Sequence, residues 1–270
     1  MRRARRAGVL GSPIAHSRSP QLHLAAYRAL GLSDWTYDRI ECTAEQLPQV
    51  VAGFGPEWVG VSVTMPGKFA ALRIADDVSA RARLVGSANT LVRCPAGWHA
   101  DNTDVDGVRG ALADARGIDR AMVIGSGGTA PAVIAGLAEL GARHITVVAR
   151  DAGKAAPLVE LAGRCGAAAH FCDIAAPGLA DEVAGVDVVV NTVPADAVAR
   201  YAPVLAATPR LLDAIYYPWP TPLAAEVLAR GGTVTSGLEM LLNQAFSQVE
   251  QFTGMPAPRE AMRAALPVAD

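Results

Sequence analysis

The chain has 270 residues, of which 51% are hydrophobic and only 5% aromatic, and its 24 basic and 26 acidic side chains give a formal net charge of −2 at pH 7. This length suffices for two domains, and a core built from Ala, Val and Leu suits layered α/β packing. The balanced charge argues against a nucleic-acid-binding surface spread over the whole protein.

Other features argue against a membrane, secreted or metal-binding protein. The basic run RRARR at residues 2–6 is expected to be a solvated tail, because the apolar segment of a signal peptide does not follow it. No stretch of ~18 uncharged apolar residues occurs, so we expect a cytoplasmic protein without membrane contacts. The cysteines and histidines show neither CxxC nor HExxH spacing, so we expect no metal and no disulfide framework.

The N-terminal region begins with a strand signal followed by a helix signal. The apolar run AGVLG at residues 7–11 predicts a short strand. Ser19 and Pro20 predict a helix start, because serine can cap free amides and proline is well tolerated in the first turn. Gly31 is expected to end this helix.

Strand and helix signals continue to about residue 104. Thr43 and Gln46 have the spacing of a capping box, which predicts a second helix. Residues 58–64 predict the next strand. Two further segments, residues 89–93 and 98–103, are expected to form a hairpin across the turn CPAG.

From about residue 105 the strand and helix signals alternate more regularly. The apolar runs predict strands buried on both faces, which is typical of a parallel sheet between layers of helices. These runs are AMVIG (121–125), HITVVAR (144–150), VDVVVN (186–191) and RLLDAIY (210–216). Two helical segments, residues 238–252 and 259–266, end the chain.

A glycine-rich segment, GSGGTA, directly follows the first of these strands and opens a helix. Gly125 permits a tight turn, Gly127 lets the backbone approach a pyrophosphate, and Ala130 is small where helix meets sheet. The helix N-terminus adds amides and partial positive charge. The segment predicts a dinucleotide site, with a purely structural turn as the alternative. The predicted site consists of Gly125, Ser126, Gly127, Gly128, Thr129 and Ala130.

The end of the second strand favours NADP over NAD. An NAD site would have an acidic residue there for the ribose hydroxyls, whereas this strand ends in Arg150. Lys154 follows one helical turn later, so two cations can face a 2′-phosphate. Asp151 is adjacent and can partly offset their charge.

Seven short patterns together resemble the shikimate dehydrogenase family, in order and over nearly the whole chain. They are GSPIAHSRSPQLHLAA, VSVTMPGK, GSANTLV, ADNTD, GSGGTA, DAIYYPWPTPL and SGLEMLLNQAF. The resemblance implies an α/β fold of two domains. Residues 1–104 plus 238–270 would form a substrate-binding and catalytic domain, and residues 105–237 a Rossmann-like, doubly wound parallel-sheet domain that binds NADP.

The activity that the resemblance implies is the reversible reduction of 3-dehydroshikimate to shikimate by NADPH. Hydride delivery to a ketone leaves negative charge on oxygen, and a nearby acid can supply the proton. Lys68 matches the catalytic lysine of the family, and Asp104 matches its partner aspartate. An N-cap for the following helix is the alternative role of Asp104.

The resemblance also implies a polar substrate pocket. Ser17 and Ser19 match the residues that hold the substrate carboxylate, although Ser19 could instead serve only as a helix cap. The matches for the ring hydroxyls are Thr64, Asn89, Tyr216 and Gln244. Asn89 could alternatively shape a turn and Tyr216 could anchor a loop. Gly237 is assigned to the cofactor site.

Two alternative functions remain open. One is a quinate/shikimate dehydrogenase that uses NAD, against which Arg150 and the two serines argue. The other is a non-catalytic, dinucleotide-sensing paralogue, against which the retention of Lys68 and Asp104 argues. Ala149 and Asp151 depart from the usual family residues beside the arginine, which weakens the inference of NADP preference. We expect a monomer or homodimer whose only partner is a small-molecule substrate.

Overall fold

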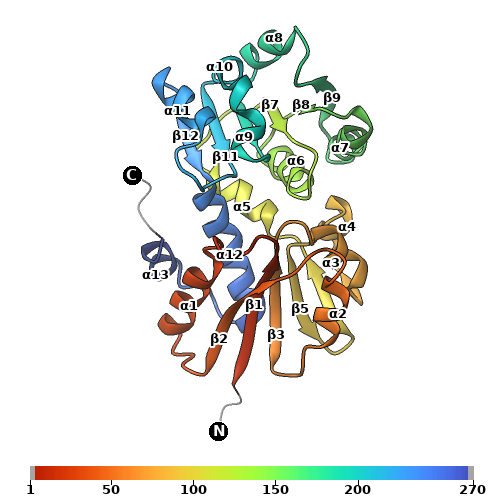
Figure 1. The fold of residues 1–270 in the computed structure, drawn as a ribbon, viewed down its shortest axis with the longest axis vertical. Helices are drawn as coiled ribbons and strands as arrows, with labels where there is room; N and C mark the ends of the chain where they lie inside the picture. Colours follow the sequence, from red (N-terminus) through yellow and green to blue (C-terminus); the bar gives the residue numbers. More distant parts are fainter. Residues whose placement is uncertain (1–3, 267–270) are drawn as a thin grey trace. The chain divides into compact units, whose positions relative to one another are not determined.

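The computed structural model describes residues 4–266, which form two compact units (Figure 1). The first unit holds the chain up to Asp104 and from Leu241 onward, and the second holds Val105–Met240. Both are α/β, and the predicted fold class is confirmed. The two connecting helices, α5 (Asp104–Ala111) and α12 (Gly237–Thr253), each have residues in both units.

The first unit contains a mixed six-stranded sheet in the order β2-β1-β3-β5-β6-β4. Strands β2, β1 and β3 are parallel to one another, whereas β5 is antiparallel to both of its neighbours. The strands are β1 (Arg5–Gly11), β2 (Trp35–Glu41), β3 (Trp58–Val63), β4 (Asp77–Val78), β5 (Thr90–Cys94) and β6 (Gly97–Asp101). The other helices of this unit are α1 (Ser19–Ala29), α2 (Leu47–Ala52), α3 (Lys68–Ile74), α4 (Ala80–Val85) and α13 (Arg259–Ala264).

Helices cover both faces of this sheet. Successive residues of a strand point to opposite faces, so neighbouring residues of β1 pack in different clusters. Val9 packs with residues of α1, α12 and α13, among them Leu22 and Phe246. The next residue, Leu10, packs in a second cluster with residues of α2 and α3, among them Leu47. The segments before and after the second unit in sequence therefore share one core.

Most local predictions for this unit are confirmed. Gly31 follows α1 with φ of +68°, a left-handed conformation that favours glycine. The Thr43 N–H donates to Gln46 Oε1 at 3.0 Å and the Gln46 N–H donates to Thr43 Oγ1 at 3.4 Å, the reciprocal bonds of a capping box, but they close the turn before α2, whose N-cap position is Gln46. The predicted hairpin is the β5–β6 pair, in which Cys94 faces Gly97.

The prediction of a solvated basic tail is wrong for the part that the structure describes. Arg5 and Arg6 belong to β1 rather than to a tail. The Arg6 guanidinium pairs with Asp38 at 2.9 Å and lies 4.7 Å from the centre of the Trp58 ring, so its charge contacts both a carboxylate and an aromatic face. Residues 2 and 3 of the basic run lie outside the described residues.

The second unit is built on an all-parallel six-stranded sheet in the order β12-β11-β10-β7-β8-β9. Its strands are β7 (Arg120–Ile124), β8 (His144–Ala149), β9 (Ala168–Asp173), β10 (Val188–Asn191), β11 (Arg210–Asp213) and β12 (Thr233–Ser236). Its other helices are α6 (Ala130–Glu139), α7 (Ala152–Arg164), α8 (Leu179–Ala184), α9 (Ala195–Val198), α10 (Ala202–Leu205) and α11 (Pro222–Ala229), with a 3₁₀ turn at Ala199–Tyr201.

The strand order of the second unit places a topological switch point between β7 and β10. The chain proceeds outward from β7 through β8 to β9, then returns to pair β10 with the other side of β7. Ligands of doubly wound sheets bind at the carboxyl ends of the strands beside such a switch point. The GSGGTA segment begins one residue after β7 and so occupies this position.

Two kinds of feature are absent from residues 4–266. No helix in this range combines the length and the apolar character needed to cross a membrane. Nor do three or more His, Cys, Asp or Glu side chains gather there in a way that could hold a metal ion.

Candidate active site and nucleotide loop

Lys68 and Asp104 form a buried ion pair in the first unit. Lys68 is the first residue of α3, and the Gly67 N–H closes the preceding corner by donating to the Thr64 carbonyl at 2.9 Å. Asp104 is the first residue of α5, and its own N–H donates to Asn102 Oδ1 at 3.1 Å. Lys68 Nζ lies 2.6 Å from Asp104 Oδ2, and the two residues are only 8% and 6% exposed. Each charge therefore compensates the other where little water can do so.

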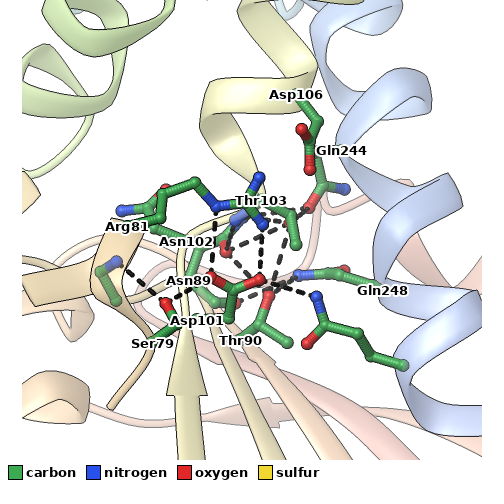
Figure 2. A network of polar contacts seen from close by, with 12 residues as sticks. Ser79, Arg81, Asn89, Thr90, Asp101, Asn102, Thr103, Asp106, Gln244 and Gln248 are labelled. Atoms are coloured by element: carbon green, nitrogen blue, oxygen red, sulfur yellow. Dashed lines mark hydrogen bonds and ion pairs between the residues drawn. The ribbon is translucent and has the colours of Figure 1, made fainter.

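Asn89 binds the other oxygen of this carboxylate. Its Nδ2 donates to Asp104 Oδ1 at 2.9 Å. Thr103 Oγ1 and Gln244 Oε1 lie 3.0 and 3.2 Å from the same nitrogen, and Figure 2 shows Asn89 with these two residues. Gln244 is on α12 and donates through Nε2 to the Leu241 carbonyl at 2.8 Å. Lys68 and Asn89 thus each bind one oxygen of Asp104 and together fix the orientation of the carboxylate. These contacts favour the role of Asp104 as the partner of Lys68 over a role as a helix cap.

The first unit thus brings four of its seven predicted site residues into one cluster. These are Lys68 on α3, Asn89 just before β5, Asp104 on α5 and Gln244 on α12. The prediction did not name Thr103, although it stands inside the quoted ADNTD pattern and is fully buried between Asn89 and Gln244.

The remaining three predicted residues lie at the ends of β1 and β3 and the start of α1. Arg18, not Ser19, occupies the N-cap position of α1, so the capping role considered for Ser19 is wrong. The hydroxyl with a local structural role is that of Ser17, which accepts from the Ser19 N–H at 3.4 Å. Thr64 follows β3 beside Gly11, where an added Cβ would come within 2.3 Å of the Thr64 methyl group.

A second buried carboxylate, Asp101, lies at the end of β6. Burial opposes its ionisation, but hydrogen bonds from Arg81 and Ser79 outweigh that cost and lower the pKa of Asp101 to about 2. Arg81 Nη2 lies 2.5 Å from Asp101 Oδ2, and Ser79 Oγ donates to Oδ1 at 2.7 Å. Gln251 Nε2 on α12 donates to Oδ2 at 2.7 Å. This ionised group fixes the strand that leads to Asp104.

In the second unit, the first glycine of the predicted nucleotide loop is required by its backbone. Gly125 has φ of +115°, which residues with a Cβ rarely adopt. An added Cβ would lie 2.4 Å from Thr192 Oγ1 and 2.7 Å from a Val193 methyl group. Thr192 is held in place by donating to the Ile124 carbonyl at 2.7 Å. The loops after β7 and β10 therefore approach closely at the switch point.

The rest of the loop leaves space over the start of α6. A Cβ added at Gly127 would meet no atom within 4 Å, so packing within the protein does not require a glycine at this position. Ser126 and Gly128 lie on either side of it, and Thr129 leads into α6, which begins at the buried Ala130. An open backbone followed by a ten-residue helix has the donors and dipole that a pyrophosphate requires.

Arg150 and Lys154 are both exposed beside the end of β8. Arg150 directly follows the strand, which neighbours β7 in the sheet. The carboxylate of Asp151 accepts from the Lys154 N–H at 3.2 Å and caps α7. The adjacent acid thus has a structural role, and it leaves the two cationic side chains in solvent at the strand end.

The two other predicted residues of the second unit stand beside β11 and β12. Tyr216 is half-buried in the loop after β11. That loop is held by the fully buried Asp213, which accepts from Asn191 Nδ2 at 2.9 Å and from Thr221 Oγ1 at 2.6 Å. Burial raises the pKa of Asp213. Gly237 is the first residue of α12. A Cβ there would lie 2.3 Å from the Ala214 carbonyl oxygen, so close packing alone explains a glycine at this position.

Two family models match the chain. Residues 9–91 match the model described as shikimate dehydrogenase substrate binding domain. Residues 237–266 match the model described as shikimate 5′-dehydrogenase C-terminal domain. Both segments lie almost wholly in the first unit.

Individual relatives match nearly the whole chain. It is 34% identical to shikimate dehydrogenase (NADP(+)) of Microcystis aeruginosa, with 96% of this chain and 95% of the relative covered. The crystal structure of Mycobacterium tuberculosis shikimate dehydrogenase is 70% identical, with a TM-score of 0.93 over 97% of this chain and 98% of that chain. The Thermus thermophilus shikimate 5-dehydrogenase in complex with NADP(H) and shikimate is 30% identical, with a TM-score of 0.80 over 97% and 100% of the two chains.

Proposed function

Because the chain belongs to the shikimate dehydrogenase family, we propose that it catalyses the reversible, NADP-dependent reduction of 3-dehydroshikimate to shikimate. Lys68 and Asp104 would assist the proton transfer. The observation that carries this proposal is their ion pair, in which 2.6 Å separates two side chains that are almost fully buried. The first unit would bind substrate and the second would bind the cofactor.

The nucleotide loop of the second unit fits NADP. Gly125 and Gly127 keep the backbone bare at the switch point, and the N-terminus of α6 offers amides to the pyrophosphate. Arg150 and Lys154 would face the 2′-phosphate, and Gly237 would lie at the cofactor as the family pattern implies. When bound, the nicotinamide supplies or accepts a hydride at a carbon of the substrate ring.

Lys68 would supply the proton that the ketone oxygen needs as it gains charge. A positioned acid of this kind typically contributes ~10² to 10⁴ in rate. Asp104 orients the lysine through the Nζ–Oδ2 contact, and Asn89 holds Asp104 in turn. In the reverse direction the same lysine would take the proton from the shikimate hydroxyl.

The substrate ring would be held by hydrogen-bonding side chains. Ser17 and Ser19 would bind the carboxylate. The proposed contacts to the ring hydroxyls are Thr64, Asn89, Tyr216 and Gln244. A site built to pair hydroxyls discriminates against analogues that lack them, because its own polar groups would be left unpaired.

A single absorbance assay tests the proposed function. Purified protein is mixed with shikimate and NADP, and the reduced-nicotinamide band is followed, with shikimate plus NAD and quinate plus NAD as parallel reactions. We expect the fastest initial rate with shikimate and NADP. Faster turnover of quinate with NAD would favour the quinate dehydrogenase alternative. Binding of NADP without turnover of either substrate would favour a dinucleotide sensor.

A further inference from the structure

We propose that Thr90 and Gln248 are positioning residues that hold the Asn89 amide with its N–H groups toward Asp104. The inference deepens the proposed function and rests on it. Both residues are buried, at 0% and 1% exposure, and neither belongs to the predicted substrate contacts. They extend the polar cluster around Asn89, and Figure 2 shows Asn89, Thr90 and Gln248 together.

The first step concerns the two ends of the Asn89 amide. The main-chain N–H of Thr103 lies 2.8 Å from Asn89 Oδ1, and a main-chain N–H can only donate. The atom that faces it must therefore be the amide oxygen. This leaves the amide nitrogen facing Asp104 Oδ1 at 2.9 Å, where it donates to a carboxylate.

The second step is the Thr90 hydroxyl, which supports the same orientation because it binds the same oxygen. Thr90 Oγ1 donates to Asn89 Oδ1 at 2.8 Å. Its own lone pair is engaged, because Gln248 Nε2 donates to it at 2.9 Å. Since the Gln248 amide nitrogen can only donate, the single Thr90 proton is available for Asn89 Oδ1, which lies closer, at 2.8 Å, than Thr103 Oγ1 at 3.4 Å.

The third step fixes Gln248 itself. Its Nε2 also lies 3.1 Å from the Asn89 main-chain carbonyl, and a carbonyl can only accept, so this end of the amide is the nitrogen. The Gln248 Oε1 then accepts from Ser62 Oγ at 2.6 Å. Ser62 accepts in turn from the Tyr37 hydroxyl at 2.6 Å.

The result is a directed chain of hydrogen bonds that ends on the catalytic pair. Its polarity is set by two main-chain groups, the Thr103 N–H and the Asn89 carbonyl, which cannot exchange donor and acceptor roles. A flipped Asn89 amide would place its oxygen against the Asp104 carboxylate and its nitrogen against a donor. Thr90 raises the cost of that flip because it donates to the amide oxygen, and Gln248 contributes through the bond that it donates to the Thr90 hydroxyl.

The test uses a near-isosteric pair of variants in the full-length protein. Thr90→Val removes the hydroxyl but keeps the shape, and Thr90→Ser keeps the hydroxyl. We expect Thr90→Val to lower kcat about tenfold, the equivalent of one lost hydrogen bond, while the KM for NADP stays within about twofold. Thr90→Ser should recover kcat to within about twofold of the parent. Gln248→Met should also lower kcat.

Gln251→Leu is the matched control, because it removes a glutamine bond of 2.7 Å from the same helix to the end of β6 without touching Asn89. Its kcat should stay close to that of the parent. Equal kcat for Thr90→Val, Gln248→Met and the parent would overturn the inference, as would an equal loss in Gln251→Leu. If Thr90→Val does not fold, judged by circular dichroism, Gln248→Met decides. Absence of shikimate turnover in the parent would instead overturn the proposed function.

Discussion

The candidate site of the second unit is formed mainly by main-chain atoms, whereas that of the first unit is formed by side chains. In the second unit the nucleotide loop is shaped by backbone, with Gly125 at φ of +115° and open space beside Gly127. In the first unit the site is made of side chains that bind one another, with Lys68, Asn89 and Asp104 joined by bonds of 2.6 and 2.9 Å. A pyrophosphate is bound mainly by accessible main-chain N–H groups, whereas proton transfer requires charged side chains at fixed positions.

This difference determines how each site should respond to mutation. A backbone site is damaged by adding atoms, and a side-chain site by removing them. The predictions below test that contrast, and they run from the largest expected effect to the smallest.

Removal of the Lys68 side chain should have the largest effect. We expect Lys68→Ala to lower kcat by at least ~10² with a modest change in the KM for shikimate, because the proton donor is lost. Steady-state kinetics in the direction of shikimate oxidation measures both constants.

The control separates lost chemistry from lost stability. Lys68→Ala leaves the Asp104 carboxylate buried without its cation, which is expected to destabilise the protein. The double variant Lys68→Ala/Asp104→Asn removes that unpaired charge, so its urea midpoint should rise relative to Lys68→Ala while turnover stays low. Turnover equal to the parent in either variant would contradict the catalytic role.

Addition of a methyl group to the nucleotide loop should come next. Gly125→Ala should cost ~1–3 kcal/mol of unfolding free energy, because its φ of +115° is strained for alanine and its Cβ would lie 2.4 Å from Thr192 Oγ1. The KM for NADP should rise at least ~10-fold, since one lost pyrophosphate contact is worth that much.

Gly127→Ala is the informative comparison, because its Cβ meets no atom within 4 Å. It should leave the urea midpoint unchanged and still raise the KM for NADP. If Gly127→Ala binds NADP as well as the parent does, the loop does not approach a pyrophosphate as proposed.

A smaller effect is expected from the exposed cation at the end of β8. Arg150→Ala should raise the KM for NADP about tenfold and leave the KM for NAD nearly unchanged, because only NADP carries the 2′-phosphate. Arg143→Ala, which removes another exposed arginine just before the same strand, is the matched control. Equal KM values for NADP in Arg150→Ala and the parent would place cofactor selection elsewhere.

The smallest effect concerns stability and pH. The pKa of Asp101 is lowered to about 2 in the fold, so its ionised form stabilises the protein above the unfolded pKa of 3.8 and this contribution is lost as pH falls through about 2. Asp101→Asn should lower the unfolding free energy by about 1 kcal/mol at pH 7, after allowance for solvent screening. Urea unfolding should show this difference shrinking between pH 4 and pH 2. A constant difference would mean that charge is not its source.

The strands that were predicted and the strands that were missed differ in position. The apolar runs around β7, β8, β10 and β11 are central in the sheet and buried on both faces, so their sequences are continuous and easily recognised. The missed strands are β2, β4, β9 and β12, which lie at the two edges of each sheet. Residues of β9 such as Ala168 and His170 are exposed, so its pattern does not resemble that of a buried strand.

The site was predictable to a different degree in each unit. Gly125 and its neighbours are local, and a strand, a glycine turn and a helix are visible within about twenty residues. Lys68 and Asp104 were paired only through the family resemblance, and their roles stay predictions although the structure brings them together. Gln248 was not predicted, because its partner Thr90 is 158 positions away in sequence.

Helix α12 carries three glutamines, Gln244, Gln248 and Gln251, at a spacing that places them on one side of the helix. Each bonds across to β5, to β6 or to the residues just beyond them, at Asn89, Thr90 and Asp101. A helix held only by apolar contacts can rotate slightly with a small loss of free energy. A rotation or slide of α12 would instead break three side-chain amide contacts at once. The helix that returns the chain to its first unit is therefore held in register by three separate contacts, and the loss of Gln251 alone leaves in place the two that reach Asn89 and Thr90.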